Sequence, residues 1–326
     1  MLTVGTVGCR RLAAKYCRSL CIQGIAAHVG HADGPLPSKD EYSLPGKLYA
    51  APEELFEKAK PEAVFILVPP SERGDIEASA VQRRLHIFLH KPVGLTPKQV
   101  TGLQETMKRA KTMVAVGYHY RYSDLVERAR QFLRGKPPCV VSAEYFVGIP
   151  EDGWVRERAV SGGLLFQHMT HVFDLMRYLC GEIAEVYALE THGCMHKVPN
   201  YTWEDGASVS LLFKNKAVGS FVASCAAQHA PSSHLTMVLP DVTLRLDREK
   251  LIVREADKEM LFRSRRNAFD TCVHSFVKSI ESGDTRYVRS SFADAVKTFS
   301  VCFAAAESVR TGTAVRPSLP KVADKA

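Results

Sequence analysis

The sequence predicts an α/β protein in which an N-terminal doubly wound parallel sheet is followed by a C-terminal α+β part with a large, mostly antiparallel open sheet. Up to about residue 120, short apolar runs alternate with amphipathic helical stretches, and runs such as residues 64–68 are apolar throughout. Such runs are typical of strands buried on both faces of a parallel sheet. The pattern of apolar runs and helical stretches changes after Gly135-Lys136-Pro137-Pro138. A length of 326 residues suits two domains.

The elements of the first part follow from these runs. Strands are expected at residues 3–7, 25–29, 63–68, 87–89 and 113–116, and helices at 11–20, 52–58, 75–84 and 97–108. Residues 1–120 are therefore assigned to the first domain.

The second part begins with a helix at about residues 123–133 and continues as short strands separated by turn residues. The expected strands are 139–146, 185–191, 207–213, 217–224, 236–239, 243–246 and 250–254. Asn215-Lys216 and Asp247-Arg248 are predicted turn centres between neighbouring strands, which favours an antiparallel sheet. Helices at about 268–282 and 291–311 close a domain assigned to residues 121–316, and residues 317–326 are expected to form a loose tail.

The composition is typical of a globular protein, with 46% hydrophobic and 24% charged residues. No run approaches the roughly 18–20 uncharged apolar residues of a membrane helix, and the N-terminus lacks the order of a signal peptide. We therefore expect a cytoplasmic protein without a membrane partner. Nine scattered cysteines without a C-x-x-C pair indicate reduced thiols rather than disulfides or a zinc ribbon.

The net charge of +8 comes from dispersed basic residues, with small clusters only at Arg83-Arg84 and residues 263–266. A dispersed charge suits an anionic cofactor or substrate, and we expect no nucleic-acid partner.

The first expected strand runs into Gly5-Thr6-Val7-Gly8-Cys9-Arg10-Arg11-Leu12-Ala13, where a Rossmann fold carries its dinucleotide-binding G-x-G-x-x-G/A motif. Gly8 and Ala13 fit the first and third positions, but Arg10 occupies the second. A side chain there either pushes the cofactor outward or pairs with phosphate. The alternative is a Rossmann-like fold that has lost its nucleotide. The predicted cofactor contacts are Gly8, Cys9, Arg10 and Arg11.

The expected cofactor is NAD or NADP, and residues after the second strand bear on the choice. Asp33 favours NAD if it points at the adenosine ribose, whereas His31 with Arg10 would accept the extra phosphate of NADP. Asp33 is equally suited to a turn before Gly34-Pro35. Both His31 and Asp33 are kept as cofactor contacts, and the choice between the two cofactors stays open.

Two further strand ends carry candidate residues. Val68, Pro69 and Pro70 terminate the third long strand and are predicted to line the nicotinamide side, although a simple strand stop is the alternative. The strand at 87–89 stops at His90-Lys91-Pro92, because the proline prevents it from continuing. Open α/β sheets hold ligands at such carboxyl ends, so Lys91 is a predicted catalytic residue, and His90 and Lys91 are predicted cofactor contacts.

A helix that ends near Cys180-Gly181 contains His168, His171 and Asp174 at three-residue steps. This spacing puts the three on one side of the helix, with imidazole facing a cleft and a carboxylate behind it. Two histidines and a carboxylate also suit zinc, but no fourth ligand is evident and we expect no metal.

Taken together, these motifs resemble the Gfo/Idh/MocA family, named after glucose-fructose oxidoreductase, inositol dehydrogenase and a rhizopine-catabolism protein. The resemblance runs over nearly the whole chain. It rests on the Val-Pro-Pro turn, Lys91-Pro92, the segment 117–122, Ser161-Gly162-Gly163 followed by His171 and Asp174, Glu204-Asp205-Gly206-Ala207 and the segment 289–295.

The resemblance implies an N-terminal Rossmann domain and hydride transfer between a nicotinamide cofactor and a sugar-like, polyol or cyclic alcohol or ketone. Lys91 matches the family's catalytic lysine, although His90 replaces the usual glutamate before it. His171 matches the catalytic histidine, although Gln167 replaces the usual aspartate four residues earlier. Lys91, with a pKa lowered by desolvation beside the nicotinamide, and His171 are expected to touch the reacting oxygen. Substrate contacts are expected from Tyr118, Arg121, Trp154, Arg156, Gln167 and His168.

The rival interpretation is a non-catalytic family member that keeps the fold as a binding or assembly module. Arg10, His90, Gln167, and Arg73 where relatives often have histidine, favour it, whereas Lys91 with His171 favours the enzyme. In either case the exposed face of the open sheet is expected to be covered by a second subunit, giving a homodimer or homotetramer.

Overall fold

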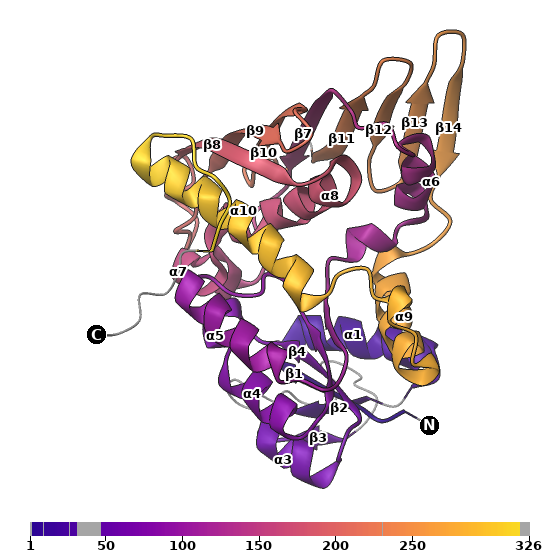
Figure 1. Ribbon diagram of the computed structural model, residues 1–326. Helices are drawn as coiled ribbons and strands as arrows, with labels where there is room; N and C mark the ends of the chain where they lie inside the picture. Colours follow the sequence, from indigo (N-terminus) through magenta and orange to yellow (C-terminus); the bar gives the residue numbers. More distant parts are fainter. Residues whose placement is uncertain (1, 9, 26, 31–46, 230, 320–326) are drawn as a thin grey trace. The chain divides into compact units, whose positions relative to one another are not determined.

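The computed structural model describes residues 2–8, 10–25, 27–30, 47–229 and 231–319 (Figure 1). These residues form two compact units. Of the described residues, the first unit contains those up to His119 together with Phe269–Ala295, and the second contains Tyr120–Ala268 and those from Val296 onward. The predicted fold class is confirmed in both units.

The first unit is built on a six-stranded sheet in the order β3-β2-β1-β4-β5-β6, and all of its described pairings are parallel. This is the strand order of the doubly wound dinucleotide fold, in which the order reverses between β1 and β4. The strands are β1 (Val4–Gly8), β2 (Ala27–Gly30), β3 (Leu48–Tyr49), β4 (Ala63–Leu67), β5 (His86–Leu89) and β6 (Val114–Val116).

Helices cover both faces of this sheet (Figure 1). On one face, Tyr16 and Phe276 pack on the rings of Phe65 and Phe88, with centroids 5.4 to 5.6 Å apart. At Gly5 the other face meets α3, because a Cβ there would lie 2.9 Å from Leu55 Cδ2. The helices are α1 (Arg10–Ile22), α3 (Pro52–Lys58), η1 (Pro70–Glu72), α4 (Asp75–Gln82), α5 (Pro97–Lys108), α9 (Ala268–Ser282) and η5 (Thr285–Tyr287).

The second unit contains an eight-stranded sheet in the order β14-β13-β12-β11-β7-β10-β9-β8. Its pairings are antiparallel except between β7 and β10. The strands are β7 (Val140–Phe146), β8 (Ile183–Thr191), β9 (Gly206–Phe213), β10 (Val218–Ser224), β11 (Ser232–Val238), β12 (Thr243–Leu246), β13 (Lys250–Arg254) and β14 (Glu259–Arg263).

Helices of the second unit lie on one face of this sheet, where Phe173 packs on Phe221 at 5.2 Å. The spacing predicts one continuous helix up to Cys180, but the structure begins it with a π-helical turn. The helical segments are α6 (Asp124–Phe132), η3 (Gly153–Arg156), α7 (Arg158–Ser161), the π turn η4 (Leu165–Met169), α8 (Thr170–Cys180) and α10 (Phe292–Thr311), and the sequence boundary between the units falls within η2 (His119–Tyr122).

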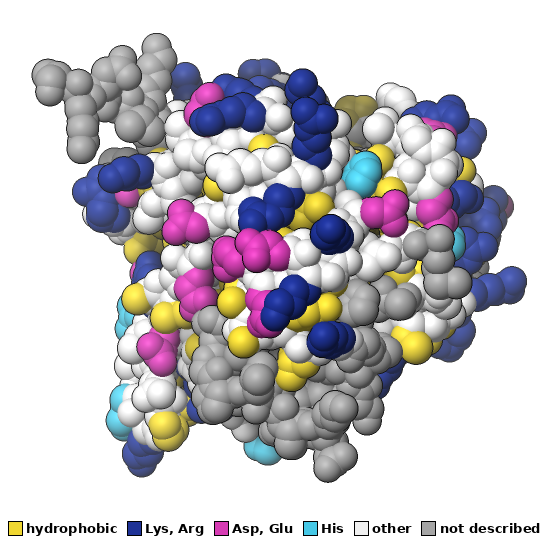
Figure 2. All heavy atoms as spheres, turned by 90° about the horizontal axis from the view of Figure 1, so that it is seen from below, with side chains coloured by type: hydrophobic (Ala, Val, Ile, Leu, Met, Phe, Trp, Pro, Cys, Tyr) yellow, Lys and Arg dark blue, Asp and Glu magenta, His cyan; other side chains and the backbone are white. Residues whose placement is uncertain are grey.

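The outward face of the eight-stranded sheet carries large apolar side chains that remain exposed, namely Val140, Tyr187, Leu189, Leu212, Val218, Val222 and Leu261. Basic side chains on the face drawn in Figure 2 are scattered among acidic ones. Within the described residues, no helix combines the length and apolar character needed to cross a bilayer.

Candidate active site

Gly8 ends β1 with a φ of +123°, a conformation that favours glycine. A Cβ at this position would lie 2.4 Å from the backbone nitrogen of Val68 and 2.5 Å from the carbonyl carbon of Leu67. The turn between β1 and α1 therefore sits directly against the end of β4. Ala13, the third position of the motif, is buried on α1, as close helix-to-strand packing requires.

These observations fit a dinucleotide site, because the start of a 13-residue helix meets two strand ends at the point where the strand order reverses. Arg11 lies exposed in the first turn of α1. The predicted contacts Cys9, His31 and Asp33, and the side chain of Arg10, lie outside the described residues.

The Val68-Pro69-Pro70 turn is held in place by Gln99 of α5. Gln99 Nε2 donates to the carbonyl oxygens of Pro70 at 2.7 Å and Arg73 at 3.3 Å. Its Oε1 accepts from the backbone N–H of Leu95 at 2.9 Å. One side chain thus fixes two segments that follow neighbouring strand ends.

Lys91 follows β5 and is 5% exposed, and its peptide bond to Pro92 is cis. The preceding His90 shares a hydrogen bond between its Nδ1 and the hydroxyl of Tyr16 at 3.0 Å. Arg73 Nη2 donates to the carbonyl oxygen of His90. Burial, reinforced by the charges of Lys91 and Arg73, holds the pKa of His90 well below its usual value. His90 is therefore a neutral imidazole at physiological pH.

In the second unit, His171 lies on α8 and is 7% exposed. Its ring lies on that of Tyr120, with centroids 4.8 Å apart. Asp174 belongs to the next turn, where its carboxylate accepts two hydrogen bonds from Arg121 at 2.6 and 2.7 Å and one from Thr298 Oγ1 at 2.8 Å. Asp174 therefore ties α8 to η2 and α10.

His168 lies in the π turn, where its ring centroid is 5.7 Å from that of Tyr145 and 5.3 Å from that of Trp203. Tyr145 and Tyr120 meet at Arg248, whose guanidinium lies 5.6 Å from the first ring centre and 5.7 Å from the second. Arg248 Nη2 also donates to the Tyr145 hydroxyl at 2.9 Å. We call Tyr120, Tyr145, His168, His171 and Arg248 the His-Tyr-Arg cluster.

Sequence reasoning did not select Tyr145 or Arg248. Arg248 was expected only as a turn centre, and Tyr145 follows the ordinary alternation of a half-buried strand. Tyr120 lies inside the segment 117–122 that carries the family resemblance, so the sequence contained a signal for that residue.

Two sequence motifs hold the start of the helical segment η4–α8, namely Ser161-Gly162-Gly163 and Glu204-Asp205-Gly206-Ala207. Gly163 has a φ of +75°, and a Cβ there would lie 2.5 Å from Glu204 Oε2. Glu204 Oε1 accepts from the N–H of Leu165 at 3.1 Å, while Trp203 Nε1 donates to Ser161 Oγ at 2.9 Å. Burial raises the pKa of Glu204 against the opposing charge of Arg158. These motifs position η4 and the histidine that it carries.

The remaining predicted substrate residues lie in several places. Tyr118 is buried in the first unit, and Gln167 lies buried in the π turn. Trp154 is half-buried in η3, whereas Arg156 donates to the carbonyl oxygens of Pro150, Glu151 and Pro199. Contact of these residues with substrate stays a prediction. Among the described residues, no group of three or more His, Cys, Asp or Glu side chains is placed to hold a metal ion.

The strand order and the Gly8 turn are those of a dinucleotide-binding Rossmann fold, and comparison with known families agrees. Residues 4–118 match the family described as an oxidoreductase family with an NAD-binding Rossmann fold, and residues 136–244 match the GFO/IDH/MocA C-terminal domain. The chain therefore belongs to the Gfo/Idh/MocA family.

Similar curated proteins include two inositol dehydrogenases. The chain is 26% identical over 178 residues to myo-inositol 2-dehydrogenase of Thermotoga maritima and 28% identical over 180 residues to scyllo-inositol 2-dehydrogenase (NAD(+)) of Bacillus subtilis. The alignments cover 53% of this chain and 52% and 51% of those proteins, so the chain spans about half the length of either relative.

Solved structures share the fold over nearly the whole chain. Levoglucosan dehydrogenase in complex with NADH and levoglucosan superimposes with a TM-score of 0.84 at 18% identity, covering 97% of this chain and 99% of that one. An oxidoreductase from Agrobacterium radiobacter in complex with NAD+, L-tartaric acid and magnesium gives 0.84 at 16% identity, covering 97% and 98%.

Proposed function

We propose that the protein is an NAD(P)-dependent oxidoreductase that transfers hydride between a nicotinamide cofactor and a sugar-like, polyol or cyclic alcohol or its ketone. The observation that carries the proposal is Lys91, which is buried at the carboxyl end of β5 in a sheet with the dinucleotide-binding strand order. The names of the two inositol dehydrogenases among its relatives support the substrate class.

The nicotinamide, when bound, accepts or supplies the hydride. Gly8, Arg10 and Arg11 would hold the pyrophosphate at the start of α1, and Val68, Pro69 and Pro70 would line the nicotinamide side. Lys91 and His171 would both touch the reacting oxygen, and one of them takes the hydroxyl proton during oxidation and returns it during reduction.

The neighbours of Lys91 favour proton release in this scheme. A neutral His90 stands where relatives carry a carboxylate, and Arg73 brings a cation to the same strand end. Like charges disfavour each other, so the Arg73 guanidinium favours the neutral amine of Lys91.

A Lys91→Met variant tests the role of the lysine. Because a positioned acid or base contributes about 10²- to 10⁴-fold to rate, turnover should fall by a factor in that range. NADH binding, measured by the blue shift of nicotinamide fluorescence, should persist. Lys98→Met, an exposed lysine on α5, is the matched control and should keep full activity. Full turnover by Lys91→Met would contradict the mechanism.

The rival is a non-catalytic module, favoured by Arg10 in place of the second glycine. Titration of the full chain with NADH and NADPH separates the two functions. Saturable binding of either supports the enzyme, and no binding of either at millimolar concentration supports the module.

We further propose that the protein forms a homodimer or homotetramer through the outward face of the eight-stranded sheet. Seven large apolar side chains are exposed on this face, and an apolar surface of that kind favours association.

A further inference from the structure

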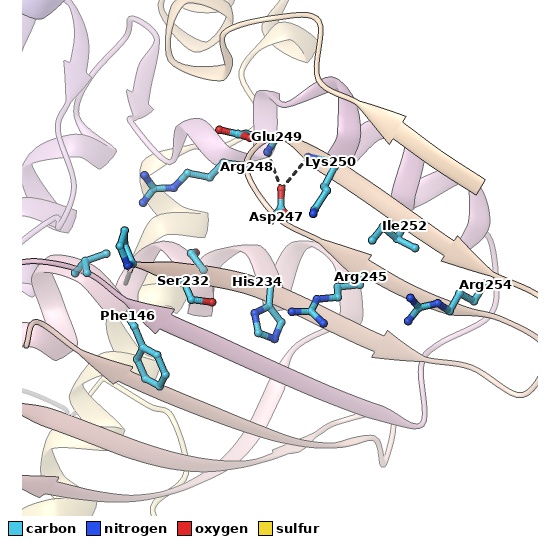
Figure 3. A pocket seen from close by; sticks show the side chains of 13 residues that line it. Phe146, Ser232, His234, Arg245, Asp247, Arg248, Glu249, Lys250, Ile252 and Arg254 are labelled. Atoms are coloured by element: carbon cyan, nitrogen blue, oxygen red, sulfur yellow. Dashed lines mark hydrogen bonds between the residues drawn. The ribbon is translucent and has the colours of Figure 1, made fainter. Parts of the chain in front are cut away.

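Arg248 lies in a rigid turn between β12 and β13. The N–H of Asp247 donates to the carbonyl oxygen of Lys250 at 2.9 Å, and the Asp247 carboxylate accepts from the N–H groups of Glu249 and Lys250 at 2.8 Å each. Figure 3 shows the two contacts of the Asp247 carboxylate and the Arg248 side chain leaving the turn. The turn thus fixes the point from which the guanidinium reaches Tyr120 and Tyr145.

The partners of this guanidinium are phenols. Tyr145 accepts a hydrogen bond at 2.9 Å, and both tyrosine rings lie within 6 Å of the cation, a distance typical of cation–π contact. Burial raises the pKa of Tyr145, so that its hydroxyl stays neutral. Among the described residues, no carboxylate forms a salt bridge with Arg248, and Asp247 is engaged by its own turn.

Other arginines of the same unit differ from Arg248. Arg121 is paired with Asp174, Arg158 with Glu190, and Arg177 with Glu182, in each case at 3.1 Å or less. Their positive charges are thus compensated within the fold. Arg248 is instead exposed to solvent, and its charge is available to a ligand.

The position of Arg248 links this charge to the proposed chemistry. Tyr120 contacts both Arg248 and His171, while Tyr145 contacts both Arg248 and His168. On the outward face of the sheet, Arg248 also lines a cavity of about 640 Å³, whose other charged or titratable lining residues are His234, Arg245, Lys250 and Arg254 together with the acidic Asp247 and Glu249 (Figure 3). Through Tyr120, a ligand at His171 lies one aromatic ring away from the Arg248 guanidinium.

We propose that Arg248 determines specificity by binding an anionic group, so that the substrate is a sugar or polyol that carries a carboxylate or phosphate. Guanidinium groups bind both anions through two parallel hydrogen bonds, which gives orientation as well as affinity. This inference deepens the proposed function and rests on it, since it assigns the charged part of the substrate for that same site.

Binding of paired probes to the full chain tests the inference, with tryptophan fluorescence as the readout because Trp203 contacts His168. The pairs are D-glucuronate with D-glucose and D-gluconate with D-glucitol, and glucose 6-phosphate distinguishes phosphate from carboxylate. At least one acidic probe should bind about 10-fold more tightly than its neutral partner, which corresponds to about 1.4 kcal/mol. Equal affinities, or no saturable response to any acidic probe, would overturn the proposal.

Two substitutions at Arg248 and one control complete the test. Arg248→Met should abolish the preference for the acidic probe. Arg248→Lys should keep part of that preference, because lysine keeps the positive charge but lacks the paired N–H donors of the guanidinium. Arg263→Met removes one exposed charge from β14 and should leave the preference unchanged. A preference that survives Arg248→Met would also refute the proposal.

Failure of this inference is distinguishable from failure of the proposed function. If NADH binds and Lys91→Met loses turnover but acidic and neutral probes bind alike, the role of Arg248 is wrong and the oxidoreductase stands. If neither cofactor binds while the acidic probes bind through Arg248, the anion site stands and the hydride transfer is wrong.

Discussion

At the scale of single residues, His90 and Arg73 are two departures from the family pattern that meet at one strand end. Arg73 donates to the carbonyl oxygen of His90, and its charge helps to keep the imidazole neutral. The sequence presents these departures as separate losses, 17 positions apart. Their contact brings both departures together at the strand end that carries Lys91.

Gly8 carries a prediction at the same scale. Gly8→Ala forces a Cβ within 2.4 Å of the Val68 nitrogen at a φ of +123°. Such a backbone conformation alone costs a non-glycine residue about 1–3 kcal/mol, and the β1–α1 turn must also move away from β4. We expect a loss of at least that size in urea unfolding, together with weaker NADH binding.

Gly102 is the matched control for Gly8. It lies inside α5, where a Cβ would meet nothing within 4 Å. Since glycine in a helix interior costs roughly 0.5–1 kcal/mol relative to alanine, Gly102→Ala should stabilise the protein. Equal unfolding midpoints for the two variants would contradict the role assigned to Gly8.

At the scale of elements, the Arg121–Asp174 pair is buried, with side chains 4% and 1% exposed, and it joins η2 to α8. Removing Arg121 takes two hydrogen bonds from the buried Asp174 carboxylate and leaves it with the more distant Arg177, at 4.0 Å. Arg121→Met should therefore cost about 3–5 kcal/mol in the free energy of unfolding.

The double variant Arg121→Met/Asp174→Leu should recover much of that loss, because two apolar side chains replace the ion pair without leaving a buried charge. Urea unfolding of the wild type, the single variant and the double variant measures this coupling. A double variant less stable than Arg121→Met would mean that the pair stabilises the fold by more than charge compensation.

The elements differ in how well the sequence predicts them. The bounds of α3, α5 and α9 coincide with the predicted ones, and in α3 and α5 a proline at the start of the helix marks the boundary. The π turn η4 was not predicted, because the spacing of His168 and His171 reads as an ordinary helix and the wider turn depends on contacts with Glu204 and Trp203. Strand β14 was also missed, because its apolar residues Met260, Leu261 and Phe262 stand in a row and the sequence therefore shows no apolar-polar alternation.

At the scale of the whole molecule, the candidate site was predictable only where a local motif marks it. Lys91 and His171 stand in recognisable local patterns. Tyr145 and Arg248 are 103 positions apart and meet only because the β12–β13 turn reaches the end of β7. The periodicity of a single segment cannot predict this contact, because the contact depends on the pairing of β7 with β11 and of β11 with β12.

The open sheet carries the prediction that belongs to this scale. Val218 and Val222 on β10 are 52% and 41% exposed on its outward face. Val218→Asp/Val222→Asp should convert the expected dimer or tetramer to monomer in light scattering, because charges would be buried without partners at the interface. Circular dichroism should remain unchanged.

Ile22→Asp is the control for the sheet variant, since Ile22 is 75% exposed on α1 of the first unit. It should leave the oligomeric state as in the wild type. A wild-type protein that is monomeric, or a double variant that still associates, would refute the assigned interface.

The return of α9 to the first unit has a consequence for biosynthesis. Phe276 covers the rings of Phe65 and Phe88, yet it follows them by about 190–210 positions in the chain. Because a chain emerges from the ribosome N-terminal end first, this aromatic surface of the nascent nucleotide-binding unit stays partly uncovered while the entire eight-stranded sheet is being synthesised. The order of the segments therefore determines when this unit can close, which is only after residues 269–295 have been synthesised.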